Sequence, residues 1–148
     1  MTLKTRIHDD MKAALRAKEA ARLSAIRLLL AAIKQKEVDE RIELDDAQVL
    51  AIVERVLKQR RESIAQFEKA GREDLAAAER FEAELLSGYL PAQLGAEAVA
   101  QAIDEVIAQT GAAGPKDMGR VMSALKARLA GRADMGAVSA QVKAKLAG

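Results

Sequence analysis

The side chains most suited to chemistry in this sequence are basic, and they gather near its C-terminal end. Up to Gly95 the 17 Lys and Arg residues balance the 17 Asp and Glu residues. After Ala112 seven basic residues face only two carboxylates, so this part of the chain carries a net charge of +5. The seven are Lys116, Arg120, Lys126, Arg128, Arg132, Lys143 and Lys145. Such a local excess favours an anionic partner, and the phosphate backbone of a nucleic acid is one.

Some of these basic residues share a helical face with small residues. Within GPKDMGRVMSALKARLAGRAD, the apolar positions on one side of a helix are Met118, Val121, Met122, Leu125 and Leu129. The other side carries Lys116, Gly119, Arg120, Ser123 and Ala127. A glycine inside a helix costs about 1 kcal/mol relative to alanine, and a small, basic surface would let a phosphate backbone approach closely. The competing interpretation is that small residues are simply frequent in an alanine-rich chain, and the residues alone do not decide between the two.

Catalytic and metal-binding chemistry has little support elsewhere in the sequence. His8 is the single histidine, and its neighbours Asp9 and Asp10 belong to other helical faces, so we interpret it as a surface residue. The sequence contains no cysteine, which excludes disulfides, thiolate nucleophiles and cysteine metal sites. No glycine-rich phosphate loop, nucleophile elbow or Ser-Lys pair is recognisable. We therefore expect no catalytic residue, no metal site and no cofactor.

A second basic cluster lies in the N-terminal half, where Lys58, Arg60 and Arg61 could contact phosphates. Glu54 and Glu62 lie within one helical turn of them. Mixed charges at this spacing more often form a solvated helix face, and that is the interpretation we favour for this cluster.

The elements that must position all these residues are helices. A first helix is expected over residues 3–15, with Thr2 as its N-cap. Its apolar stripe is Leu3, Ile7, Met11, Ala14 and Leu15. A second follows and is interrupted by the polar stretch KEVDERIELDD, in which Val38 is its last, weak apolar position. A third starts at Asp45, because Asp45 with Gln48 three residues later resembles a capping box.

A fourth helix is expected from about Arg72, after Gly71 has ended the third, and Pro91 stops it. The apolar stripe predicted to be its buried face is Leu75, Ala78, Phe81, Leu85 and Tyr89. The segment YLPAQLG is therefore expected to be a boundary, with Tyr89 packed in the joint.

Three shorter helices are expected beyond this boundary, over residues 96–110, 115–129 and 134–147, separated by glycines. No segment alternates with the period of two that a strand requires. The sequence thus predicts an all-α protein with an N-terminal four-helix unit, residues 1–92, followed by a small three-helix C-terminal domain, residues 95–148.

The compartment can also be predicted from the sequence. No apolar run approaches the roughly 20 residues that span a bilayer, and the amphipathic, partly acidic N-terminus is unlike a signal peptide. The absence of cysteine fits a reducing compartment. We therefore expect a cytoplasmic protein without a membrane partner.

The C-terminal segment KDMGRVMSALKARLAGRADMGAVSAQVKAKL resembles the C-terminal helical module of the GatB/YqeY family. The same module is the tail of the B subunit of the glutamine-dependent amidotransferase that acts on misacylated Asp-tRNA(Asn) and Glu-tRNA(Gln). The first unit is similar to free-standing YqeY-like proteins in RLSAIRLLLAAIKQKEVD, VLKQRRESIAQFEKAGREDL and YLPAQL, so the resemblance covers essentially the whole chain.

The resemblance implies roles for the signature positions of the module. Met122 is implied to be a core residue, Gly131 to end a helix and Asp134 to cap one. Lys116, Gly119 and Arg120 are the implied RNA contacts. In the large enzyme the tail recognises tRNA, whereas transfer takes place in a cradle domain and ammonia comes from a separate subunit; this chain lacks the cradle, so the chemistry does not follow from the resemblance.

We therefore expect a non-catalytic, tRNA-associated adaptor. The residues expected to bind folded RNA are Lys116, Gly119, Arg120, Lys126, Arg128, Arg132 and Lys143. Two alternatives remain open: an accessory component of a glutamine-dependent tRNA amidotransferase, a carbon-nitrogen ligase with glutamine as amide donor, and a protein-interaction module whose N-terminal bundle binds a partner helix. The scarcity of aromatic residues counts against recognition of single strands by base stacking.

Overall fold

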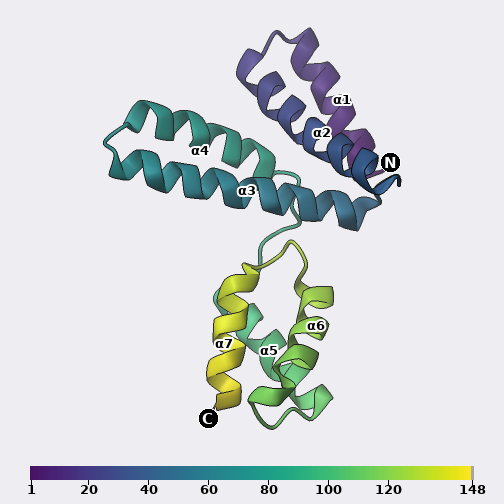
Figure 1. The fold of residues 1–148 in the computed structure, drawn as a ribbon, viewed down its shortest axis with the longest axis vertical. Helices are drawn as coiled ribbons and strands as arrows, with labels where there is room; N and C mark the ends of the chain where they lie inside the picture. The colour runs from purple at the N-terminus through teal and green to yellow at the C-terminus, as the bar shows by residue number, and fades with distance from the viewer. Residues whose placement is uncertain (148) are drawn as a thin grey trace. The chain divides into compact units, whose positions relative to one another are not determined.

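The computed structural model describes residues 1–147, and within them the chain forms seven α-helices and one short 3-10 helix (Figure 1). No strand occurs in this range, so the predicted all-α class is confirmed. The chain divides into two compact units, Met1–Leu90 and the part that begins at Pro91. The elements are α1 Leu3–Arg16, α2 Ala20–Glu40, α3 Asp46–Lys69, α4 Glu73–Ser87, α5 Ala96–Thr110, η1 Pro115–Asp117, α6 Met118–Leu129 and α7 Met135–Ala147.

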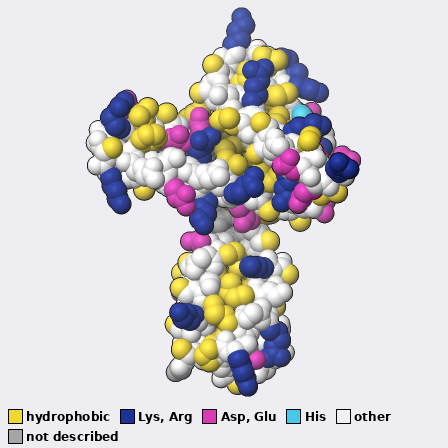
Figure 2. Space-filling view, viewed as in Figure 1, with side chains coloured by type: hydrophobic (Ala, Val, Ile, Leu, Met, Phe, Trp, Pro, Cys, Tyr) yellow, Lys and Arg dark blue, Asp and Glu magenta, His cyan; other side chains and the backbone are white. Residues whose placement is uncertain are grey.

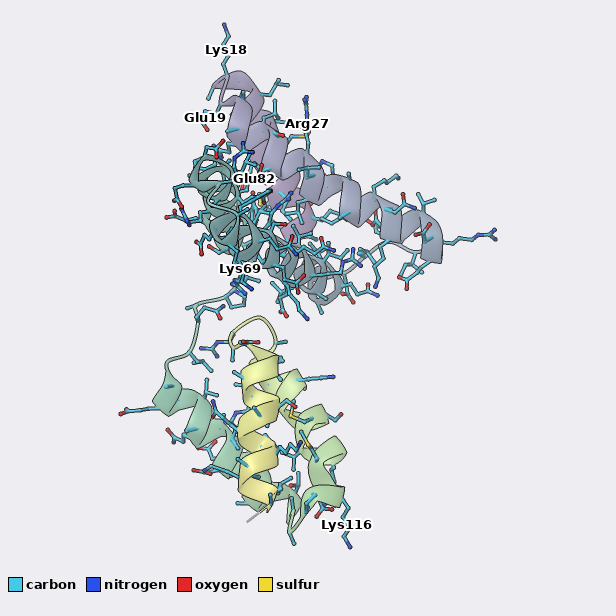
Figure 3. All side chains as sticks on the ribbon, turned by 60° about the vertical axis from the view of Figure 1, so that its left-hand side comes forward. Lys18, Glu19, Arg27, Lys69, Glu82 and Lys116 are labelled. Atoms are coloured by element: carbon cyan, nitrogen blue, oxygen red, sulfur yellow. The ribbon has the colours of Figure 1, made fainter. Side chains whose placement is uncertain are left out.

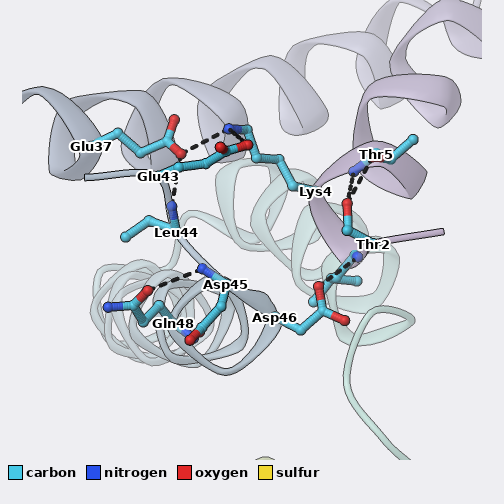
Figure 4. Close-up of polar contacts among 10 residues, drawn as sticks. Thr2, Lys4, Thr5, Glu37, Glu43, Leu44, Asp45, Asp46 and Gln48 are labelled. Carbon is cyan, nitrogen blue, oxygen red and sulfur yellow. Dashed lines mark hydrogen bonds and ion pairs between the residues drawn. The ribbon is translucent and has the colours of Figure 1, made fainter. Parts of the chain in front are cut away.

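The starts of α1 and α3 are set by side-chain caps, as the sequence predicts. Thr2 Oγ1 accepts a hydrogen bond of 3.1 Å from the backbone N–H of Thr5. At α3, Asp45 Oδ1 accepts from the N–H of Gln48 at 2.9 Å, and Gln48 Oε1 accepts from the N–H of Asp45 at 3.0 Å (Figure 4). Both bonds of the predicted capping box are therefore present, and they satisfy N–H groups that the first turn of a helix leaves unpaired.

The core of the first unit takes side chains from all four of its helices. It includes Ile7 and Ala14 of α1, Ile26, Leu29 and Ile33 of α2, Val49, Ile52, Val53, Val56 and Leu57 of α3, and Leu86 of α4. Two positions expected on buried stripes are instead exposed, namely Leu15 at 53% and Val38 at 60%. Each lies near the end of its helix, where the neighbouring helix no longer covers it.

The second helix is longer than predicted, because the start of the polar stretch KEVDERIELDD is still helical. α2 continues to Glu40, and Glu37 within it is buried. Glu37 Oε2 accepts hydrogen bonds from Lys4 Nζ at 2.8 Å and from the backbone N–H of Leu44 at 2.9 Å (Figure 4). A partnered carboxylate can be buried, so this glutamate ties α2 to α1 and to the loop before α3 rather than ending the helix.

The predicted buried stripe of α4 is wrong over most of the helix, although Leu85 packs half-buried against the core and Tyr89, just past the helix, is buried. Leu75 is 37% and Phe81 49% exposed, whereas Ala76 and Leu86 are fully covered. α4 packs mainly along α3, and the turn that joins the two helices lies away from α1 and α2 (Figure 1). The outer half of this hairpin consists of α3 and α4 alone. The side of α4 that carries Leu75 and Phe81 therefore has no third helix to pack against.

The second unit is a three-helix core of aliphatic residues. It is made by Val99, Ala102, Ile103, Val106, Val121, Leu125, Leu129, Val138, Val142 and Leu146. Met122 packs against this core half-buried, and Asp134 Oδ1 accepts from the N–H of Gly136 at 3.0 Å at the start of α7. Gly131 ends α6 with a φ of +73°, a left-handed conformation that favours glycine. These three implied roles agree with the structure.

The segment around Pro91 is held by different partners on its two sides. Tyr89 belongs to the first unit, where its hydroxyl donates a 2.6 Å hydrogen bond to Asp10 and its ring lies under the Arg6 guanidinium at 5.0 Å. In the second unit, Gln93 donates to the carbonyl of Gly131 at 2.6 Å, and the N–H of Leu94 donates to the carbonyl of Arg132 at 2.9 Å. Tyr89 thus packs within one unit, and only about three residues separate the two sets of contacts.

Candidate nucleic-acid interface on the second unit

The two faces of α6 are divided as the sequence predicts. Val121, Leu125 and Leu129 are buried in the core, and Met118 and Met122 are half-buried against it. The opposite side is exposed throughout, and its members are Gly119, Arg120, Ser123, Lys126 and Ala127. With Lys116, which is exposed in η1, these residues form what we call the α6 face.

Small residues run along the middle of the α6 face, and basic residues flank them. Gly119, Ser123 and Ala127 follow one another at four-residue spacing, so they line up along the helix. A Cβ atom added at Gly119 would meet no other atom within 4 Å. Lys116 projects away from the helices into open space (Figure 3). The surface above Gly119 is therefore open to close approach by a ligand, with positive charge beside it.

The turn before α6 is built on Asp117, which also holds Arg120. Asp117 Oδ2 accepts from the N–H groups of Ala113 at 2.9 Å and Gly114 at 3.3 Å, and Oδ1 accepts from Arg120 at 3.1 Å. The hydrogen bond from Ala113, the largest influence, holds the pKa of this carboxyl below its ordinary value. Arg120 remains 56% exposed, and an exposed ion pair of this kind contributes little to stability because water screens it. Its guanidinium can therefore exchange this carboxylate for a phosphate at little cost.

Two basic residues of the C-terminal segment are neutralised by α5. Arg128 forms an ion pair with Glu105, and Lys145 forms one with Asp104. The hydrogen bond from Arg128 lowers the pKa of Glu105, which keeps the carboxylate charged. Both partners come from α5, outside the stretch in which the sequence showed an excess of +5, so the excess is partly cancelled in three dimensions. The net charge of the segment alone does not show this cancellation, although the acids themselves, Asp104 and Glu105, are visible in the sequence just before the segment.

The remaining predicted residues do not join the α6 face. Arg132 follows the end of α6, about 18 Å from its start at 1.5 Å per residue, and its Nε donates to the carbonyl of Ala92 at 3.4 Å. Lys143 is exposed on α7. Basic side chains are accordingly scattered over the visible surface of this unit rather than gathered in one patch (Figure 2). Of the seven predicted residues, the structure brings together Lys116, Gly119, Arg120 and Lys126.

Lys116 and Lys126 differ from Arg120, the third basic residue of the α6 face, in forming no ion pair with a described carboxylate. Neither forms an ion pair with any described residue, although Arg120 does. An unpaired surface cation has no ion pair to lose when it binds an anion. These two lysines are therefore the side chains most ready to contact a phosphate.

The described residues, 1–147, were also compared with the requirements of a metal site and of a membrane-spanning helix. No group of three or more His, Asp or Glu side chains is placed to hold a metal ion, and His8 is exposed. No helix of the described range is long and apolar enough to cross a membrane. In the second basic cluster, Arg60 turns toward α4, while Lys58 and Arg61 are exposed.

Curated relatives of this chain share one name. The chain is 41% identical over 87 residues to the altered inheritance of mitochondria protein 41, mitochondrial, of Eremothecium gossypii. This match covers 58% of the chain and 48% of the relative. The protein of that name from Saccharomyces cerevisiae is 33% identical over 85 residues, with 57% and 46% covered. The one from Pyrenophora tritici-repentis is 30% identical over 134 residues, with 83% and 71% covered. The chain thus spans about half the length of the first two relatives and most of the third.

These names correct the predicted compartment. The relatives are named as mitochondrial proteins, which contradicts the expectation of a cytoplasmic one. The expectation rested on the lack of cysteine and of a long apolar run. Neither property separates one reducing, aqueous compartment from another, so the composition never carried the information that the prediction required.

The resemblance seen in the sequence is confirmed at the level of the family. The sequence model of the family described as Yqey-like protein matches residues 4–146, which includes both units and the segment that joins them. The quoted motifs from both halves fall within this range. The chain therefore belongs to the YqeY-like protein family.

Proposed function

We propose that this chain is a non-catalytic adaptor that binds folded RNA, most suitably tRNA, through the α6 face. The observation that supports this most directly is the open surface above Gly119, flanked by Lys116 and Lys126, which have no ion-pair partner among the described residues. A phosphate could approach the helix backbone closely at this point and meet two unpaired ammonium groups.

The composition of the second unit favours phosphate contacts over contacts to bases. The three aromatic residues of the chain are Phe67, Phe81 and Tyr89, and all precede Pro91. The second unit therefore has no aromatic ring on which an unpaired base could stack. Recognition by shape and phosphate position suits a folded RNA such as tRNA.

The proposal is tested by the salt dependence of binding to unfractionated tRNA. If the α6 face neutralises about three phosphates, log K should fall with log salt with a slope of about −2 to −3. Replacing Lys116 and Lys126 by Ala in the full chain should make the slope shallower by about one to two. The matched control replaces Arg128 and Lys145, which removes the same charge but acts on residues already paired with α5, and should change the slope less.

Gly119 provides a second, steric arm of the same test. Gly119→Ala should be tolerated, because the added Cβ has open space. Gly119→Leu should weaken tRNA binding several-fold while leaving the salt slope nearly unchanged, because it blocks approach without removing charge. Binding that is insensitive to salt, or equal losses in the lysine and control variants, would contradict the α6 face as the contact. Such a result would favour the alternative that the chain binds a protein partner.

A further inference from the structure

The longest helix of the first unit carries a row of unpaired cations. Between residues 55 and 69, α3 has five basic side chains. Only Arg60 among them turns inward, where it forms ion pairs with Glu79 at 3.3 Å and Glu82 at 3.1 Å across the contact with α4. The other four are exposed and form no ion pair within the described part of the chain; they are Arg55, Lys58, Arg61 and Lys69.

This pairing differs from the rest of the hairpin. Arg80 of α4 is held by Glu68 and Glu73, and Arg72 by Asp74. Glu68, the acid of α3 next to Lys69, is therefore engaged by Arg80 of α4. Glu62 is the exposed carboxylate that interrupts the row.

The four cations lie on the side of α3 that faces away from the core. The buried residues of α3 centre on Val49, Val53 and Val56, and the row lies on the opposite side of the helix. Ala65 is exposed between Arg61 and Lys69, and Ala51 is exposed about one turn before Arg55. We call this surface, from Ala51 to Lys69, the α3 face. Its cations extend over about 21 Å at 1.5 Å per residue.

The α3 face lacks what a membrane or a protein partner would need. Among residues 1–147, the exposed large hydrophobic residues are Met1, Leu15, Leu28, Val38, Ile42, Leu75 and Phe81, and none of them is on α3. An interfacial helix requires an apolar side to enter the lipid, and a protein interface usually has an apolar or aromatic centre. A long row of charges on small residues instead fits a polymer with regularly spaced anions.

We propose that the α3 face is a second phosphate-contacting surface, which binds the same folded RNA as the α6 face. This inference rests on the proposed function, because it takes the RNA from there. The two faces share their chemistry: exposed basic residues, all but Arg120 without an ion-pair partner among the described residues, beside alanine, serine or glycine. Two such surfaces on one RNA would raise the affinity by adding their phosphate contacts.

The test uses the full chain with unfractionated tRNA at several salt concentrations. Lys58→Ala with Arg61→Ala should weaken binding about tenfold or more near 0.1 M salt and make the salt slope shallower by about one to two. The control variant, Lys12→Ala with Lys34→Ala, removes the same charge from two exposed, unpaired lysines on α1 and α2. Its slope should stay close to that of the unmodified chain. Circular dichroism melting should show that all variants fold.

Removing the interrupting acid should have the opposite effect. Glu62→Gln deletes a negative charge that repels the RNA, so tRNA should bind about two- to fivefold more tightly at low salt. Glu84→Gln, at an exposed acid on α4 that forms no ion pair with described residues, is its control and should have a smaller effect. Tighter binding by a variant that melts at the same temperature as the unmodified chain cannot be attributed to a loss of structure.

The outcomes separate this inference from the proposed function. Both proposals are supported if one RNA binds per chain and if the changes in salt slope of the α3 and α6 variants add in the combined variant. A normal slope for the α3 variant with a reduced one for the α6 variant overturns only the α3 face. Binding of two RNA molecules per chain also overturns the α3 face as a second contact to the same RNA. So does an α3 variant that binds tRNA normally but no longer binds vesicles of mixed phosphatidylcholine and phosphatidylglycerol. A normal slope for the α6 variant alone overturns the proposed site and leaves the α3 face as the contact.

Discussion

At the scale of single residues, buried charge decides where the first unit is sensitive to pH. Glu37 is 9% exposed and is held by the Lys4 ammonium and the backbone N–H of Leu44. The hydrogen bond from Lys4, helped by the one from Leu44, lowers the pKa of Glu37 from its ordinary value near 4.5. The folded state therefore favours the charged form more strongly than the unfolded state does.

This difference predicts how stability depends on pH. Because the pKa of Glu37 is lower in the folded state, its contribution is complete above the unfolded pKa and is lost as the pH falls through the folded one. The melting temperature of Glu37→Gln should be lower than that of the unmodified chain at pH 7, and the gap should narrow as the pH falls below about 4.5. Glu97→Gln, at an exposed acid, is the control. A gap that stays constant down to pH 3 would show that the charge of Glu37 does not stabilise the fold.

At the scale of elements, α4 shows that an apolar stripe in the sequence does not determine which side of the helix is buried. The sequence contains two stripes on this helix, one through Leu75 and Phe81 and one through Ala76 and Leu86. The structure buries the second against α3 and leaves the first exposed. The periodicity predicts a helix correctly, but the buried side depends on how many neighbouring helices reach it.

Two matched substitutions test this assignment. Leu86→Ala should lower the free energy of unfolding by about 2–5 kcal/mol, because it leaves a cavity in a fully buried position. Phe81→Ala removes a larger side chain but should cost much less, within about 1 kcal/mol, because that ring is half exposed. Urea unfolding of the full chain measures both. Equal losses, or a larger loss at Phe81, would mean that the originally predicted stripe is the buried one.

At the scale of the whole molecule, the segment around Pro91 limits how the units can be separated. Tyr89 is bound within the first unit, and Gln93 and Leu94 are bound to the loop at Gly131 and Arg132. Few contacts therefore protect the residues between them. The predicted domain ranges, 1–92 and 95–148, place a boundary in this region, and we predict that each range folds on its own.

Limited digestion with a protease of broad specificity should cut the chain first within residues 90–93. The expected products are two fragments that resist further digestion, because each contains its own hydrophobic core. Mass spectrometry of the early products identifies the site. First cleavage inside α3 or α4, or rapid loss of either fragment, would contradict two separately folded domains.

The sequence by itself determined the features that depend on neighbours along the chain. The Thr2 cap, the Asp45–Gln48 capping box, the left-handed glycines and the buried and exposed sides of α6 all follow from residues within about one or two helical turns. The YqeY-like family was recognisable for the same reason, since its motifs are short continuous segments. These features made the all-α class and most of the helix ranges predictable.

Only the tertiary structure decided which charges remain available and which apolar sides are covered. Arg128 and Glu105 are 23 positions apart, and Lys145 and Asp104 are 41 apart, so no local pattern shows that they neutralise each other. The same holds for Arg60, which turns to α4, and for Glu37, which is buried because Lys4 reaches it from another helix. Ion pairs and burial depend on distances between helices, and those distances are set by packing rather than by sequence spacing.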